Sequence, residues 1–182
     1  MMTTANDVNL NTFLHVCGFR LEDRETILRI APIILPHLGR VTDRFYDLLL
    51  QDERIAEYLE GRIDLLKKTH LGWLESLFSG DYGADFIQRQ EKIGEVHVNV
   101  RVPPLFVAAS MSFLRAELSS VISQYILDRE EAGQSTRALL GLLDLCQYLI
   151  DRKYNETLMN NLGISQTLLV RLQTTGKKRA AS

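Results

Sequence analysis

His97 is the residue whose type and place in the sequence could most directly do chemistry. It lies in the segment 93–100, near the end of an amphipathic stretch and shortly before Pro103 and Pro104. A neutral imidazole on the inner face of a helix, held against an apolar pocket, suits one axial position of a haem iron. The alternative is a core histidine whose ring is hydrogen-bonded inside the protein, and this residue alone does not decide between the two.

No second group of residues suggests catalysis. The sequence has no phosphate-binding glycine loop and no Gly-x-Ser-x-Gly nucleophile turn. Two acidic pairs, Glu22 with Asp23 and Glu130 with Glu131, lie at predicted helix starts or in loops, where caps and solvated charges are common. We therefore predict no catalytic residue and no enzymatic activity.

The composition indicates one globular domain and excludes several other classes. The chain has 182 residues, of which 46% are hydrophobic and 24% charged, and its net charge of −2 argues against nucleic acid as the main partner. Cys17 and Cys146 form no CxxC pair and are expected to be reduced, buried thiols. The first residues are polar, and no uninterrupted apolar run reaches the roughly 18 residues of a membrane span. We expect a cytoplasmic protein, or the cytoplasmic part of a larger one that is membrane-attached.

Hydrophobic periodicity predicts helices throughout the chain. Pro32 and Pro36 should kink or stop the second helix, which begins at residue 22, and a polar connection is expected over residues 128–135. The other predicted helices span residues 9–17, 37–50, 52–59, 62–78, 84–98, 104–127, 136–162 and, weakly, 164–172. Helices of these lengths in this order can enclose a flat ligand between two layers.

Three blocks of sequence carry a resemblance to a known family. They are Phe45-Tyr46-Asp47-Leu48-Leu49, the segment 66–80 with its Leu-Phe-Ser-Gly ending, and the segment 93–100 followed by Pro103. At this mutual spacing the chain resembles the sensor domain of globin-coupled sensors, bacterial haem proteins related to the globins. The resemblance implies an all-α globin fold with an extra N-terminal helix and two long last helices. Residues 1–162 would form the sensor domain, and residues 163–182 a partly disordered linker.

The resemblance also assigns roles within a haem b site. His97 would be the proximal iron ligand, and the Tyr46 hydroxyl would donate a hydrogen bond to a diatomic ligand on the distal side. Thr69 would be a second distal polar group. The apolar contacts of the haem would be Phe45, Leu66, Trp73, Ile93 and Phe106. For Tyr46 the alternative is a half-buried aromatic ring with its hydroxyl in solvent.

Two departures from the family pattern affect this prediction. Arg101 stands where the family usually has glycine, which puts the loop geometry in question, although its guanidinium could reach a haem propionate. Phe106 and Val107 stand where Trp-Tyr is frequent, so a polar aromatic side chain near the haem edge is missing.

His70 is unusual for a distal helix. It shares one helical face with Leu66, Thr69 and Trp73, and could bind iron opposite His97, giving bis-histidyl hexacoordination. A gas would then displace it. The alternative, equally weighted, is a hydrogen-bonding or packing residue beside the iron.

The function predicted from this resemblance is a haem-based sensor of O₂, CO or NO, or of redox state. The output domain would lie outside this chain. The alternatives are a globin enzyme, such as a nitric oxide dioxygenase or peroxidase-like protein, and a haem-free docking module. A homodimer through the last two helices is expected, because one globin face does not require all of Leu139, Leu142, Leu143, Leu145, Cys146, Leu149 and Ile150.

Overall fold

A computed structural model describes residues 7–165 and 167–171 of the chain, and within these residues the protein is helical and contains no strand. The helices are α1 (Val8–Cys17), α2 (Leu21–Ile34), the 3₁₀ turn η1 (Leu35–His37), α3 (Leu38–Leu49), α4 (Glu53–Leu59), α5 (Ile63–Leu77), α6 (Ala84–Asn99), α7 (Pro104–Tyr125) and α8 (Arg129–Asn161). The all-α prediction is therefore confirmed.

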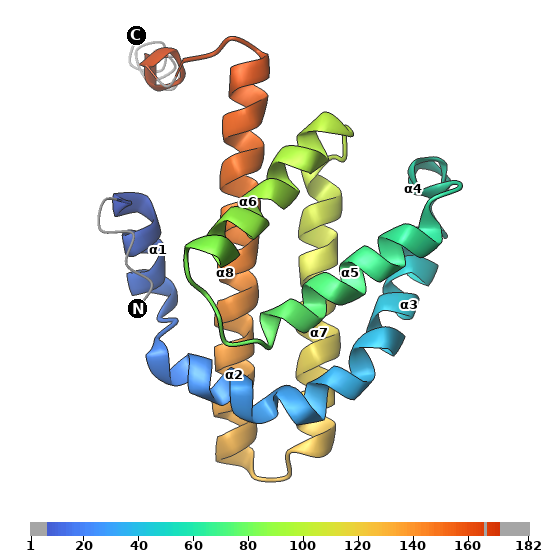
Figure 1. Cartoon of the computed structure of the whole chain (residues 1–182), viewed down its shortest axis with the longest axis vertical. Coiled ribbons are helices and arrows are strands. Elements are labelled where there is room, and N and C mark those ends of the chain that lie inside the picture. Colours follow the sequence, from blue (N-terminus) through green and yellow to red (C-terminus); the bar gives the residue numbers. More distant parts are fainter. Residues whose placement is uncertain (1–6, 166, 172–182) are drawn as a thin grey trace, which may run out of the picture.

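The helices form two layers around α8. In Figure 1, α7 and α8 run side by side, α5 and α6 cross them diagonally, α2 crosses their lower part, and α3 rises on the right beside α5. Helices α1, α2, α6 and α7 all pack on α8, whereas α3 packs on α5 and α7. This arrangement places the predicted distal residues on α3 and α5 and the predicted proximal histidine on α6.

Helix α7 is the one described helix that is long and apolar enough to cross a membrane by length and composition. One of its faces is buried, with side chains at helical spacing: Val107, Met111, Leu114, Leu118, Val121 and Ile122. This face packs inside the protein, as is typical of a core helix.

Two predicted boundaries change. The predicted connection over residues 128–135 is wrong, because α8 already begins at Arg129, and the Asp128 carboxylate accepts a hydrogen bond of 2.8 Å from the Glu131 amide. The prolines act nearly as predicted, since α2 passes through Pro32 but ends at Ile34, and Pro36 lies in η1. Residues 167–171 are helical, within the predicted weak helix, and the predicted disordered end lies outside the described residues.

The apolar residues assigned to a dimer interface belong to the core of the chain itself. All seven are buried, and none is more than 3% exposed. They cover helices α1, α2, α6 and α7 of the same chain, so the surplus of leucines on α8 is no argument for a partner. A homodimer stays a prediction without this support.

At Gly94 the backbone of α6 lies close to the backbone of α8. A Cβ atom placed on Gly94 would lie 2.2 Å from the carbonyl oxygen of Ile150 and 2.9 Å from the amide nitrogen of Tyr154. Both are backbone atoms of α8, so neither can turn away as a flexible side chain would. The absence of a side chain at Gly94 thus sets the distance between the two helices.

We predict that Gly94→Ala destabilises the protein by about 3 kcal/mol, because added volume at a packed contact forces the backbone apart. Urea unfolding followed by circular dichroism measures this loss. Gly133→Ala on α8 is the matched control, since nothing lies within 4 Å of its added Cβ. That change should be neutral or stabilising by up to about 1 kcal/mol, and an equal effect of both substitutions would contradict the prediction.

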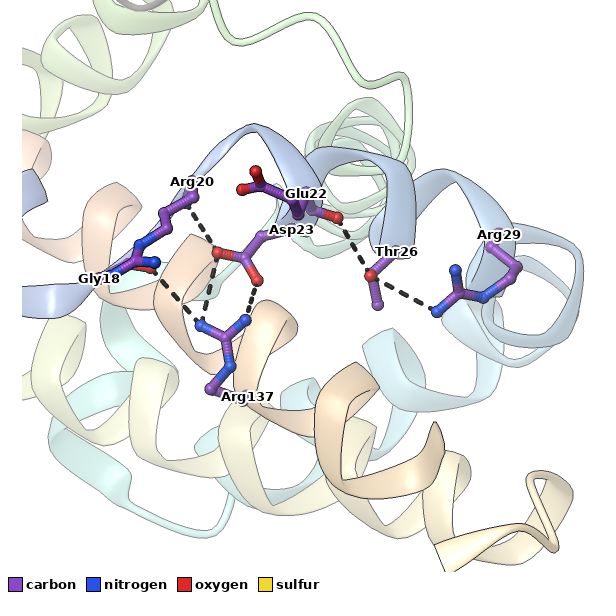
Figure 2. Close-up of polar contacts among 7 residues, drawn as sticks. All are labelled: Gly18, Arg20, Glu22, Asp23, Thr26, Arg29 and Arg137. Atoms are coloured by element: carbon purple, nitrogen blue, oxygen red, sulfur yellow. Dashed lines mark hydrogen bonds and ion pairs between the residues drawn. The ribbon is translucent and has the colours of Figure 1, made fainter. Parts of the chain in front are cut away.

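Asp23 ties the start of α2 to α8 (Figure 2). Its carboxylate accepts a 2.7 Å hydrogen bond from the Arg20 amide and pairs with the Arg137 guanidinium of α8. Arg137 also donates to the Gly18 carbonyl at 3.5 Å. Asp23 is thus a helix cap, as its position at a helix start indicated, but its side chain is 1% exposed and not solvated.

We predict that Arg137→Leu lowers the free energy of unfolding by about 2 kcal/mol at neutral pH, because a buried carboxylate loses its counter-charge. Thermal or urea unfolding checks this. The control is Arg29→Leu, whose ion pair with Glu131 is 3.4 Å long and joins two half-exposed side chains. Its removal should cost under about 1 kcal/mol. Similar losses for both variants would show that burial of Asp23 is not the cause.

Candidate functional site

Aromatic rings from α3 and α5 enclose the imidazole of His70. The Phe45 ring stacks on it with centroids 5.0 Å apart and an interplanar angle of 24°. Tyr46 meets it edge-on at 5.9 Å, and Trp73 lies at 5.7 Å on the next turn of α5. His70 therefore packs on α3.

Burial determines the charge of His70. It lowers the pKa of the imidazole to about 4, so the ring is neutral near pH 7. Its Nδ1 lies 3.2 Å from the Oγ1 of Thr42 on α3. A neutral ring with one nitrogen engaged retains the other for a second interaction.

Tyr46 is buried, with 6% of its surface exposed. The alternative of a half-buried ring is therefore wrong. Burial raises the pKa of its hydroxyl to about 12, so the group is protonated at neutral pH and can donate a hydrogen bond. Its ring also meets Phe45 edge-on at 5.3 Å, which fixes the two α3 residues relative to each other.

Apolar side chains from four helices extend this cluster. Phe45 and Tyr46 form a buried group with Ile55 and Leu59 of α4. Leu66 of α5 and Phe106 of α7 pack against it, both partly buried. The structure therefore gathers Phe45, Tyr46, Leu66, His70, Trp73 and Phe106 in one region, as predicted.

His97 lies near the end of α6. The same helix packs closely on α8 at Gly94, three residues earlier. Its Nδ1 is buried and has no hydrogen-bond partner among the described residues. Burial lowers the pKa of the ring, which favours the neutral form. The alternative of a core histidine whose ring is hydrogen-bonded inside the protein is thus not supported for Nδ1 by the contacts of the described residues. Ile93, one turn before, packs partly buried against the main core.

Helix α6 ends just beyond His97 in a Schellman motif. The Val102 amide donates to the His97 carbonyl at 2.8 Å, and the Arg101 amide donates to the Val98 carbonyl at 3.0 Å. Arg101 occupies the left-handed position with φ of 59°, where glycine is usual. The loop therefore keeps this geometry despite the substitution, and the Arg101 side chain is exposed.

Two polar residues missed by sequence reasoning take part in the site. Gln90 of α6 is fully buried, and its Oε1 accepts a 2.9 Å hydrogen bond from the Trp73 indole, which joins α5 to α6. Thr42 contacts His70, whereas the predicted Thr69 is exposed and donates its hydroxyl hydrogen to the Leu65 carbonyl at 2.8 Å. The structure thus places Thr42, not Thr69, beside the distal cluster. The sequence could have indicated Thr42, because it lies one helical turn before Tyr46 and so on the same face of α3.

Known proteins resemble this chain over most of its length. The model of the Protoglobin family matches residues 7–160. The globin domain of the Geobacter sulfurreducens globin-coupled sensor is 31% identical, with a TM-score of 0.74, and the match covers 79% of this chain and 96% of that one.

Two structures of the globin domain of E. coli DosC share the fold. The ferric form is 21% identical with a TM-score of 0.67, and the ferrous form is 20% identical with a TM-score of 0.65. Each match covers 79% of this chain and 97% of the other. The chain has the globin fold and belongs to the Protoglobin family, so the resemblance to globin-coupled sensor domains that its sequence blocks carry is confirmed.

Proposed function

We propose that this chain is a haem-based sensor domain that binds diatomic gases, with His97 as the proximal ligand of haem b. The observation that carries the proposal is the Nδ1 atom of the partly buried, neutral His97 ring, because this atom is buried and has no partner among the described residues. A buried ring nitrogen without an internal hydrogen bond is costly unless it interacts with a group outside the chain. The similarity to a globin-coupled sensor's globin domain supports the same function.

The residues present fit haem b. A flat, largely apolar ring suits the aromatic and aliphatic side chains of Phe45, Leu66, Ile93 and Phe106. Covalent haem attachment needs a CxxCH motif, and Cys17 and Cys146 are not part of one. When bound, haem supplies an iron that takes an imidazole on one face and O₂, CO or NO on the other. We assign Arg101, which is exposed just after α6, to a solvent-side carboxylate of the haem.

Tyr46 gives the site a preference among ligands. Its buried hydroxyl stays protonated and donates a hydrogen bond, which stabilises a ligand that carries partial negative charge more than a nearly apolar one. The site therefore favours O₂ over CO relative to an entirely apolar pocket.

His70 supplies the switch. Its neutral ring can occupy the sixth iron position, and a gas must then displace it, so apparent gas affinity falls by the fraction of protein in which that position is open. Because His70 packs on α3, the two states differ in the contact between α3 and α5. A sensor needs such a difference between its ligand-bound and ligand-free forms.

The sensor is favoured over the two alternatives. A globin enzyme requires repeated reduction by a partner, and multiple turnover of NO or peroxide with a reductant would be its sign. A haem-free docking module gives no reason for keeping His70 and His97 as partly buried, neutral rings. In this proposal residues 1–162 form the part of the chain that senses the ligand.

We predict that His97→Gly removes most of the Soret absorbance of hemin-reconstituted protein, because the proximal ligand is lost. Added imidazole should restore a haem spectrum by filling the vacated position. His15→Gly is the control, since His15 is exposed on α1. Absorption spectra of ferric, reduced and CO-treated protein test this. A wild-type spectrum in His97→Gly would contradict the proposal, and so would wild-type protein that takes up no hemin.

We predict that His70→Leu converts a low-spin, six-coordinate spectrum into a high-spin one, because leucine fills the space but offers no nitrogen. Ferric and dithionite-reduced spectra, with electron paramagnetic resonance of the ferric form, measure the change. Haem content should stay near the wild-type value. An unchanged spin state in the variant would leave the sensor proposal intact but remove His70 as an iron ligand.

A further inference from the structure

Thr42 uses its hydroxyl differently from several helical threonines in the same protein. Thr12, Thr26 and Thr69 donate to the carbonyl four residues earlier, at 2.9, 3.1 and 2.8 Å. Those three hydroxyls lie on exposed surfaces. Thr42 is 2% exposed, and its Oγ1 lies 3.2 Å from His70 Nδ1 on another helix. The hydrogen-bond partner of the Thr42 hydroxyl is therefore the His70 ring and not a carbonyl of its own helix.

The surroundings leave Thr42 as the polar partner of that ring. Phe45 offers His70 only an aromatic face, at an interplanar angle of 24°. The Trp73 indole N–H is already donated to Gln90, at 2.9 Å. Stacking fixes the plane of the imidazole, and among the described residues Thr42 Oγ1 is the hydrogen-bond partner of the ring. The direction of that bond then determines the tautomer.

The two directions have opposite consequences for iron binding. A neutral imidazole carries one N–H and one lone pair. If the hydroxyl accepts from Nδ1–H, the lone pair is on Nε2, which is then free to bind a metal. If the hydroxyl donates to Nδ1, Nε2 carries the hydrogen and cannot be a ligand. Histidine ligands in general are held by a hydrogen bond to their other ring nitrogen.

We propose that Thr42 is a positioning residue for the sixth iron ligand: its hydroxyl accepts the Nδ1–H of His70 and so presents Nε2 to the iron. This inference rests on the proposed function, because it requires His70 to bind haem iron. In this proposal a residue of α3 influences whether His70 or a gas occupies the sixth iron position. Thr42 and Tyr46, one turn apart on α3, then act on opposite sides of that competition, since Thr42 favours His70 and Tyr46 favours the gas.

The test compares Thr42→Val, which keeps the shape but removes the hydroxyl, with Thr42→Ser, which keeps the hydroxyl. Haem-loaded protein is reduced, and the low-spin fraction is measured together with the apparent CO association rate after flash photolysis. Loss of the hydrogen bond should weaken His70 binding by about tenfold. We therefore expect Thr42→Val to raise the high-spin fraction and the CO rate toward the values of His70→Leu, and Thr42→Ser to remain close to wild type.

The outcomes separate this inference from the proposed function. If the wild type shows no low-spin form, or if His70→Leu leaves the spectrum unchanged, His70 is not an iron ligand. This inference is then wrong as well. A wild type that loses the low-spin form in His70→Leu but keeps it in Thr42→Val overturns the role of Thr42 alone. A larger low-spin fraction in Thr42→Val also overturns it, because Thr42 then holds the non-binding tautomer.

A measurement on the wild type covers the case in which Thr42→Val does not fold. Nitrogen-15 NMR of the ferrous six-coordinate protein, which is diamagnetic, identifies the protonated ring nitrogen of His70. A proton on Nδ1 in slow exchange with solvent is expected. A proton on Nε2 would overturn the proposal.

Discussion

Burial of α8 against four other helices is the constraint on which the rest of the structure depends. Helices α1, α2, α6 and α7 all pack on it, and its own apolar residues are enclosed from Ala138 to Ile150. Two specific contacts fix where neighbours sit along it. Gly94 allows α6 to touch the α8 backbone, and Asp23 anchors the start of α2 through Arg137. The position of His97 is a consequence of the first contact.

The site combines groups that burial keeps uncharged. Tyr46, His70 and His97 would each ionise more readily in water, and burial favours the neutral form of all three. Neutral imidazoles are the form that binds iron, and a protonated phenol is the form that donates. The same desolvation that costs stability therefore keeps all three groups in the form that the proposed haem site requires.

Sequence periodicity predicted most of the helices, and the resemblance to globin-coupled sensors predicted the globin fold. The predictions that failed did so for physical reasons. The first turns of α8 were taken for a loop, because the polar, solvent-facing start of an amphipathic helix has the composition of one. The leucines of α8 were assigned to a partner, since an apolar stripe does not tell whether the surface that covers it belongs to the same chain. Thr42 was missed and Thr69 preferred because a hydroxyl's neighbours depend on how α3 crosses α5, which periodicity does not encode.

The contact at Gly94 has a mechanical consequence. Side chains between two helices can change rotamer and absorb a small shift of one helix, but here backbone faces backbone. A displacement of α6 at His97 is therefore transmitted to α8 near Ile150 with little slack. Beyond that point α8 continues to Asn161, past the buried part of the helix, toward the C-terminal segment of the chain. The backbone contact at Gly94 therefore couples the position of His97 on α6 to that of α8, which extends to the far end of the domain.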